Sequence, residues 1–366
     1  GLGLVHVMAS WVDGAFSPHL ARPLLALFAL APAAWLHATL RHRGPAAARA
    51  AALLWLSLPI LYYLRLPHDD LHRAATGLVV GPERAEAWLG GGPWFRADGP
   101  SLDGGGDLPL AAFLCGAAVH LWRACGLGPA AARATDRADL LLVVLCAAGM
   151  VLVKNEGKAL LAVLALGLVL AALVGALLRG RAAGPPAAGR RVALGLGALA
   201  LGLVPALPWT TFAADIPTVD ESYPERLTAD NLQRAWSERR FNDASVRLAT
   251  PARIIAEEYA ATLAHPLTWN LLWFAFAGAL LAALRRPRRT ARSGALLPLA
   301  IVLGGLALFY LILMVTPWQL GLLFDTGIPD RLFLQVAPLA ALAVALVAFG
   351  GGDELEPELA EEAPAP

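Results

Sequence analysis

Lysine is almost absent from this chain, whose 366 residues include only Lys154 and Lys158. Charged residues of all kinds make up 16% of the sequence, against 58% hydrophobic residues. A soluble domain of this length needs a more charged surface, so the composition excludes an ordinary soluble fold. The formal net charge of +1 also excludes the strong basic field of a nucleic-acid-binding protein.

Several familiar signatures are missing as well. The three cysteines, Cys115, Cys125 and Cys146, form no CxxC pair and are too few for a disulfide framework. The chain has no Walker loop, GxGxxG dinucleotide loop, GxSxG elbow or kinase motif set. Its first residues lack the basic and apolar regions of a signal peptide, and Gly1 stands where Met would begin a complete chain. We therefore expect a fragment whose first membrane helix precedes Gly1.

What the sequence does contain is a series of long apolar blocks. Most are roughly 17 to 23 residues long, enough to cross ~30 Å of hydrocarbon as helices. The nine blocks are Pro23–Leu40, Ala47–Leu64, Leu108–Trp122, Ala138–Val153, Ala159–Leu178, Val192–Phe212, Leu267–Leu284, Gly294–Val315 and Leu332–Phe349. They predict an all-α integral membrane protein with about nine transmembrane helices and two large non-cytoplasmic loops.

The position of arginine in the short loops predicts the orientation of these helices. Alternate loops hold Arg41 and Arg43; Arg133 and Arg137; Arg179, Arg181, Arg190 and Arg191; and Arg285, Arg286, Arg288, Arg289 and Arg292. Arginine-rich loops are typical of the cytoplasmic side. The predicted transmembrane domain covers residues 1–349, with outer loops at 65–107, 213–266 and 316–331. The acidic tail at 350–366 is predicted to be disordered and cytoplasmic.

The outer loops contain further local patterns. Residues 227–241 and 254–263 have the periodicity of amphipathic helices. Trp269 is among the tryptophans that fall near the outer segments, where such residues often anchor a protein at the membrane interface. We therefore expect polar chemistry on this face.

Three positions at the outer helix ends are candidates for that chemistry. Asp107 immediately precedes Leu108-Pro109, a position that suits either a helix N-cap or a base or metal ligand facing an outer cavity. The turn Lys154–Lys158 suits either a solvated connection or phosphate binding by its lysines. Arg331 stands where the charge rule disfavours arginine, so it either snorkels to the interface or binds phosphate.

A weaker signal lies in the first outer loop. His68 and His72 are four residues apart and would share one face of a helix, which is a spacing that suits a metal ion. No HExxH motif accompanies them, and solvated loop residues are the alternative interpretation. The metal site therefore stays open.

Three segments carry short motifs: Gly106–Ala111, with an acidic residue before Leu-Pro-Leu-Ala; Val153–Gly157, with Lys-Asn-Glu-Gly; and 316–338, with Asp-Arg-Leu-Phe-Leu-Gln. In this order they resemble the bacterial GT-C glycosyltransferases, which are similar to the protein O-mannosyltransferases and the lipid A aminoarabinose transferases. The resemblance covers roughly residues 100–345. It implies a polyprenyl-phosphate sugar donor and inverting transfer on the periplasmic face of the bacterial inner membrane.

The resemblance also assigns roles to individual residues. It places Asp107 at the second acidic position of the catalytic site, as base or metal ligand. The first acid should precede the first predicted span, so it is either Asp13 or a residue upstream of the chain. Lys154 and Arg331 are the predicted ligands of the donor phosphate.

Supporting roles are implied for Glu156, which would orient Lys154, and for Asn155 and Asp330. A histidine expected near Leu323 is absent. The resemblance leaves open whether a divalent metal ion serves as a cofactor. The predicted partners are the lipid bilayer, a polyprenyl-phosphate-linked sugar and a glycan, lipid or protein acceptor, with no nucleic acid.

Three other functions stay open from the sequence. They are a transporter or flippase for a lipid-linked sugar, a polysaccharide polymerase or ligase, and a non-catalytic membrane assembly subunit. A transporter should carry polar residues midway through its spans. Because the polar candidates gather at the outer helix ends, the pattern favours an enzyme of the outer face.

Overall fold

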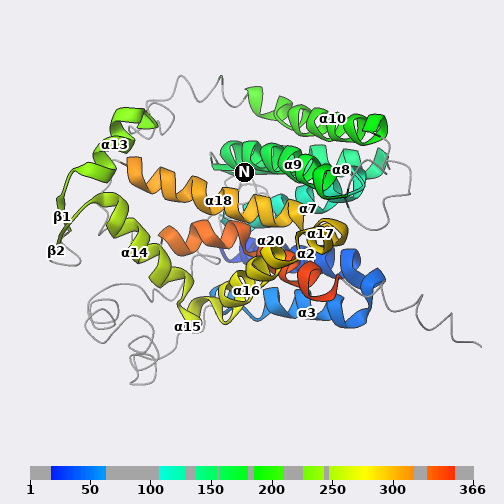
Figure 1. Ribbon diagram of the computed structural model, residues 1–366, viewed down its shortest axis with the longest axis horizontal. Coiled ribbons are helices and arrows are strands. Elements are labelled where there is room, and N and C mark those ends of the chain that lie inside the picture. Colours follow the sequence, from blue (N-terminus) through cyan, green and yellow to red (C-terminus); the bar gives the residue numbers. More distant parts are fainter. Residues whose placement is uncertain are drawn as a thin grey trace, which may run out of the picture.

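The computed structural model describes residues 18–62, 107–127, 137–154, 156–179, 185–208, 211, 226–242, 247–316 and 328–350. Most of these residues form helices whose axes run in roughly one direction (Figure 1). The helices of the bundle are α2 (Pro18–Leu40), α3 (Pro45–Leu56), α4 (Pro59–Tyr62), α7 (Asp107–Ala124), α8 (Arg137–Val153), α9 (Glu156–Arg179), α10 (Pro185–Leu201), α16 (Leu272–Arg285), α17 (Pro287–Ser293), α18 (Leu296–Val315) and α20 (Ile328–Phe349).

The helical membrane class predicted from the sequence is confirmed. Each of the nine apolar blocks contains a helix, and four stretches are long and apolar enough to cross a bilayer. These are Glu156–Leu178, Gly189–Ala206, Leu296–Val315 and Ile328–Phe349. The number nine for the spans stays a prediction, and the tail at 350–366 and most of the outer loops at 65–107 and 316–331 lie outside the described residues.

Two predicted spans are interrupted where proline follows a helix. The block Ala47–Leu64 forms α3 as far as Leu56, and a new short helix, α4, begins at Pro59. The block Val192–Phe212 continues α10 only to Leu201, and the chain then forms a 3-10 turn, η3 (Val204–Ala206). Proline has no N–H to donate to the preceding turn, so an α-helix tends to end before it.

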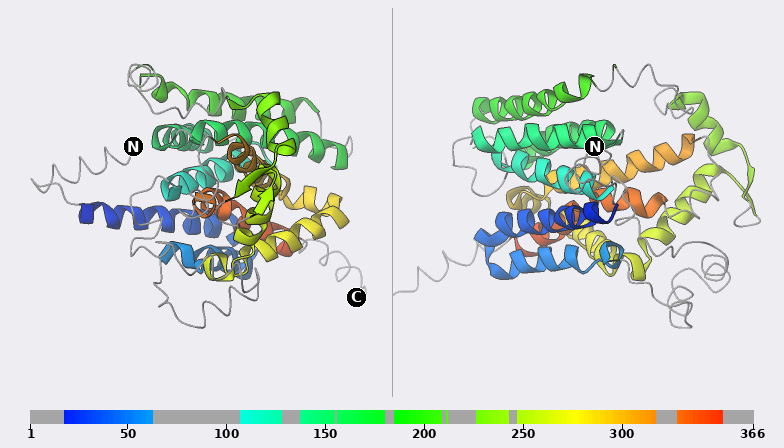
Figure 2. Two further views of the ribbon diagram at one scale, coloured as in Figure 1. Left: turned by 90° about the vertical axis from the view of Figure 1, so that its left-hand side faces the viewer. Right: turned by 180° about the vertical axis from the view of Figure 1, so that it is seen from behind.

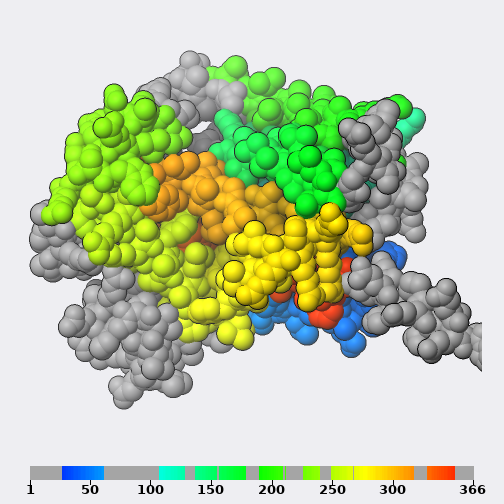
Figure 3. Space-filling model, in the orientation of Figure 1, coloured from blue at the N-terminus to red at the C-terminus, as the bar shows by residue number. Residues whose placement is uncertain are grey.

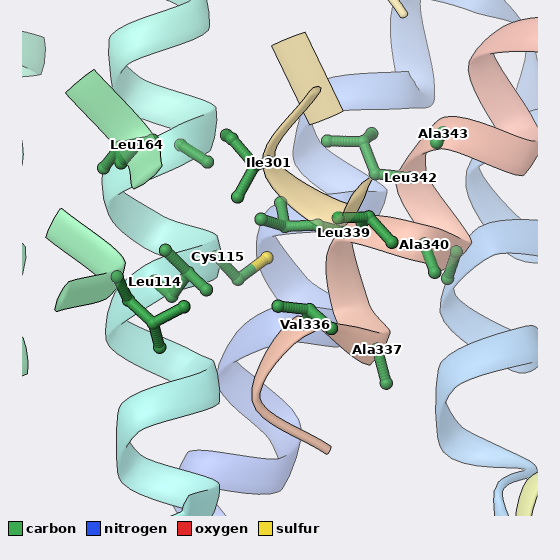
Figure 4. Packing of buried hydrophobic residues seen from close by; sticks show 14 of the residues in the cluster. Leu114, Cys115, Leu164, Ile301, Val336, Ala337, Leu339, Ala340, Leu342 and Ala343 are labelled. Atoms are coloured by element: carbon green, nitrogen blue, oxygen red, sulfur yellow. The ribbon is translucent and has the colours of Figure 1, made fainter. Parts of the chain in front are cut away.

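Helix α20 occupies the centre of the bundle. It packs against α2, α3, α7, α16 and α18, and its buried face is rich in alanine. Figure 4 shows Leu114 and Cys115 of α7 next to Ile301 of α18 and Val336 and Leu339 of α20. Small residues let helix backbones approach closely in a membrane, where apolar burial alone does not drive association.

Glycines bring the same close approach to α7 and α8. A Cβ atom on Gly116 would lie 2.7 Å from the Trp35 ring and 2.9 Å from the Cys146 sulfur. A Cβ atom on Gly149 would lie 2.7 Å from the ring of Phe113. The absence of a side chain at these two positions therefore lets α7 and α8 pack closely.

The second outer loop contains a helix, a hairpin and another helix. Thr228 caps α13 (Ala229–Ser237) by accepting a 3.2 Å hydrogen bond from the backbone N–H of Asn231. Strands β1 (Arg240–Asn242) and β2 (Arg247–Ala249) pair antiparallel, and α14 (Pro251–Leu263) follows. The amphipathic helix predicted over 227–241 is therefore too long, because Phe241 pairs with Leu248 in the hairpin.

These outer elements project from one end of the bundle (Figures 1 and 2). Two tyrosines attach α14 to α18 there. The Tyr259 hydroxyl donates a 2.7 Å hydrogen bond to the Leu306 carbonyl, and the Tyr310 hydroxyl donates a 2.8 Å bond to the Ala252 carbonyl. The second outer loop is therefore tied to the bundle rather than separate from it.

The arginine-bearing turns meet at the opposite end of the bundle, which we call the arginine end. Arg43 Nη2 donates to the Ser293 carbonyl at 2.8 Å, and Trp122 Nε1 donates to the Gly294 carbonyl at 2.9 Å. Helix α7 connects this end to Asp107, because the 15 residues from Asp107 to Trp122 rise by ~22 Å. Asp107 and the arginine turns thus lie at opposite ends of the bundle.

This two-ended arrangement predicts opposite labelling of two engineered cysteines. Lys158→Cys should react with a membrane-impermeant maleimide added to intact cells, whereas Arg288→Cys should react only after the membrane is opened. Both parent side chains are exposed, and the three native cysteines are buried, so background labelling should be low. Labelling of both variants from the same side would contradict the arrangement.

Candidate functional site

Asp107 is the centre of a buried cluster of charged and polar side chains. Its Oδ1 accepts 2.7 Å hydrogen bonds from Lys154 Nζ and from Gln335 Nε2. Its Oδ2 accepts a 2.8 Å bond from Arg331 Nε. The side chain of Asp107 is 0% exposed, so these donors replace water around the carboxylate.

Three helices bring this cluster together, and we call it the Asp107 cluster. Asp107 is the first residue of α7, and Lys154 directly follows the last residue of α8. Arg331 and Gln335 are four residues apart near the start of α20, so they share one face of that helix. Residues separated by more than 220 positions thus join the same carboxylate.

The cluster has a buried acidic centre and a more open cationic edge. The side chain of Lys154 is 23% exposed, and that of Arg331 is 30% exposed. Glu156 Oε1 lies 3.4 Å from Lys154 Nζ, and its side chain is 32% exposed. The predicted pairing of Glu156 with Lys154 is therefore present, and both cations extend from Asp107 towards the surface of the protein.

The geometry distinguishes between the roles considered for Asp107. The carboxylate accepts its hydrogen bonds from three side chains, not from the backbone N–H groups that an N-cap would engage. A carboxylate that is fully buried and held by two cations is a weak base. The arrangement favours Asp107 as the residue that positions Lys154 and Arg331, and its direct catalytic role stays a prediction.

Glycine at position 157 is required for the position of Lys154. The N–H of Gly157 donates a 3.0 Å hydrogen bond to the Lys154 carbonyl, which closes the turn between α8 and α9. A Cβ atom on Gly157 would collide with the carbonyl oxygen of Met150 in the last turns of α8. The Lys-Asn-Glu-Gly sequence therefore has a structural reason for its glycine, because α8 and α9 touch there through the backbone.

A second ionic contact fixes α7 against α8 near the arginine end. His120 Nδ1 and Asp139 Oδ1 are 2.8 Å apart and both side chains are at most 10% exposed. Arg123 Nε lies 3.6 Å from the other oxygen of Asp139. The two helices are thus joined at both ends, which limits how far Asp107 and Lys154 can separate.

Asp330 takes part in a different set of contacts from Arg331, although the two are adjacent. Trp269 Nε1 donates a 3.1 Å hydrogen bond to Asp330 Oδ1. The Trp269 ring lies 6.3 Å from that of Phe333, which also contacts Tyr259 at 4.5 Å. Trp269 is 0% exposed, so its sequence-based interpretation as an interfacial anchor is wrong.

Two polar residues of this region, Gln335 and Trp269, were given no role in the site from the sequence alone. Gln335 is 0% exposed, and its Oε1 has no hydrogen-bond partner within the described part of the chain. A glutamine four residues after the candidate Arg331 was an available signal for a shared helix face. The contact between Trp269 and Asp330 spans 61 residues, and no local pattern predicts it.

Several predicted site residues lie outside the described residues. They are Asp13, His68, His72 and Asn155. Within the described ranges, no group of three or more His, Cys, Asp or Glu side chains could hold a metal ion. The metal site and the first catalytic acid therefore stay predictions.

No family model, curated protein or solved structure matches this chain. The likeness to GT-C glycosyltransferases is thus carried by the three sequence segments alone. What the fold adds is that Asp107, Lys154 and Arg331, one from each segment, are in direct contact.

Proposed function

We propose that this protein is a glycosyltransferase that uses a polyprenyl-phosphate sugar and acts at the membrane surface on the Asp107 side. The observation that carries the proposal is the convergence of Lys154 and Arg331 on one buried carboxylate. Both cations are partly exposed at the bundle end opposite the arginine turns. Ionic hydrogen bonds from lysine and arginine are the usual means of holding a phosphate.

The reaction needs those cations at one step in particular. An acceptor hydroxyl or amine attacks the anomeric carbon, and the bond from that carbon to the phosphate oxygen breaks. The electron pair leaves on polyprenyl phosphate, so negative charge grows on the phosphate oxygen. Lys154 and Arg331, already fixed by Asp107, would stabilise that charge without reorganising.

The acceptor must also lose a proton. Asp107 is committed to the two cations, so a more open carboxylate is the better proton acceptor. Glu156, at 32% exposure, is the open carboxylate of the Asp107 cluster. Asp13, the sequence candidate that precedes the first predicted span, would serve the same step.

The location of the charged groups supports an enzyme over a transporter. In the described part of α20, the charged residues Asp330 and Arg331 stand in the first turn. In α9, Glu156 and Lys158 also stand in the first turn, and α18 contains no charged residue. A transporter would need polar groups near the bilayer midplane.

Binding of the product lipid tests this proposal directly. We expect Asp107→Asn/Lys154→Met to weaken binding of polyprenyl phosphate by roughly 10- to 100-fold, because an ionic hydrogen bond contributes about 1.5–3 kcal/mol. The pair removes one charge of each sign, so the net charge is unchanged. Affinity is measured by native mass spectrometry in detergent, with the phosphate-free polyprenol as the ligand control.

A matched variant controls for loss of an ion pair elsewhere. Arg253→Ala/Glu257→Ala removes a pair on α14 whose side chains are 59% and 30% exposed, also without changing the net charge. This control should bind polyprenyl phosphate as the unaltered protein does. Equal affinity in the cluster variant and the control would reject the phosphate site.

A further inference from the structure

A pocket of about 560 Å³ lies at the arginine end, far from the Asp107 cluster. It is formed where α17 packs on α9, and Figure 3 shows α16 and α17 in yellow beside the green surface of α9. Its lining residues are Leu178, Arg286, Pro287, Arg288, Arg289 and Arg292. Four arginines thus face one hollow of a size that holds a small charged group.

Three of these arginines lie on α17 and Arg286 directly precedes it, and this helix is held firmly at its C-terminal end. Gly294, in the left-handed conformation with φ 76°, terminates α17. Arg43 donates to the carbonyl of Ser293 at 2.8 Å, and Trp122 donates to the carbonyl of Gly294 at 2.9 Å. The arginines are therefore presented on a fixed element rather than on a loose loop.

The positive charges of Arg286, Arg288 and Arg289 are not neutralised within the described part of the protein. No carboxylate there lies within ion-pair distance of Arg286, Arg288 or Arg289. The Nε of Arg289 is buried and has no hydrogen-bond partner among the described residues. A buried guanidinium nitrogen without a partner is costly, and an anion beside the Arg289 guanidinium would offset part of that cost.

We propose that this pocket binds the phosphate of an anionic phospholipid in the adjacent leaflet. The neighbouring surface favours a lipid over a free phosphate, because Leu177 and Leu284 are 82% and 70% exposed and lie close in sequence to the lining residues. Exposed leucines of membrane helices contact acyl chains, so they place the pocket beside lipid headgroups. This inference does not depend on the proposed enzyme activity.

Lipid titration of the purified chain tests the site. Delipidated protein in detergent is titrated with phosphatidylglycerol or phosphatidylcholine of the same acyl chains, and bound lipid is counted by native mass spectrometry. We expect preference for phosphatidylglycerol, and a loss of about tenfold or more in its affinity in Arg286→Gln/Arg288→Gln. Arg285, Arg289 and Arg292 remain in that variant, so the charge signal for orientation is kept.

The control removes two arginines at the other end of the bundle. Arg234→Gln/Arg253→Gln changes exposed residues of α13 and α14 and should leave the phosphatidylglycerol affinity unchanged. Equal affinity in the pocket variant and the unaltered protein would overturn the proposal. So would displacement of the lipid by inorganic phosphate at the same concentration, which would indicate a site for free phosphate.

Discussion

Lys154→Met is expected to lower the free energy of unfolding by about 3 kcal/mol. Asp107 is 0% exposed, and without the lysine its charge keeps only Arg331 and Gln335 as partners in a site that water does not reach. Removing one partner of a buried ion pair is strongly destabilising for this reason. The change is measured from denaturant-induced unfolding in mild detergent, followed by tryptophan fluorescence.

The double variant separates buried charge from lost packing. In Asp107→Asn/Lys154→Met the carboxylate charge is gone, so we expect most of the stability to return, with a coupling free energy of about 1–3 kcal/mol between the two positions. Lys158→Met changes an exposed residue of the turn that also contains Lys154. It should change the free energy of unfolding by less than about 0.5 kcal/mol. Strict additivity of the two single changes would contradict the buried ion pair.

Sugar transfer should fall by about 100-fold or more in Arg331→Ala and in Asp107→Asn/Lys154→Met. Loss of a preorganised group that stabilises developing charge has effects of this size. The double variant is the more informative of the two, because it is expected to fold well and still to fail in transfer. Activity is measured in proteoliposomes as release of polyprenyl phosphate from a panel of polyprenyl-phosphate hexoses and pentoses, with a cell-envelope extract as acceptor.

Arg331→Lys adds a second comparison at the same position. It keeps one positive charge beside Asp107, but the guanidinium fork that presents several N–H groups is lost. We therefore expect a folded protein with reduced transfer. Normal turnover in Arg331→Ala and in the double variant would refute the role of the Asp107 cluster in sugar transfer. Absence of transfer by the unaltered protein across the whole donor panel would refute the glycosyltransferase proposal and favour a non-catalytic role.

The sequence predicted the positions of the helices but not the points at which they are interrupted. Apolar blocks predicted where helices form, since each block needs only its own length and composition. They did not predict the interruptions at Ser57 and Gly202, because proline is often tolerated within membrane helices, as Pro338 is in α20. Helix ends depend on what packs around them, which a local window does not contain.

Part of the candidate site could be predicted from the sequence alone. Asp107, Lys154 and Arg331 could be chosen individually from charge at helix ends, and the fold brings the three together. Gln335 and Trp269 carry no charge and so could not be chosen in this way, although the four-residue spacing from Arg331 was a signal for Gln335. Their partners are 228 and 61 residues distant in the sequence. Asp107 is favoured as a positioning residue because its carboxylate is fully buried, and the sequence did not reveal that burial.

The backbone contact at Gly157 makes the turn after α8 a rigid spacer. No side chain fits between residue 157 and the carbonyl of Met150. Any substitution of Gly157 would therefore push α8 and α9 apart. The reach of the Lys154 ammonium is consequently set by the length of its own methylene chain. Changes to the position of the Lys154 ammonium should therefore be sought in the segments that flank the turn, with Gly157 itself left intact.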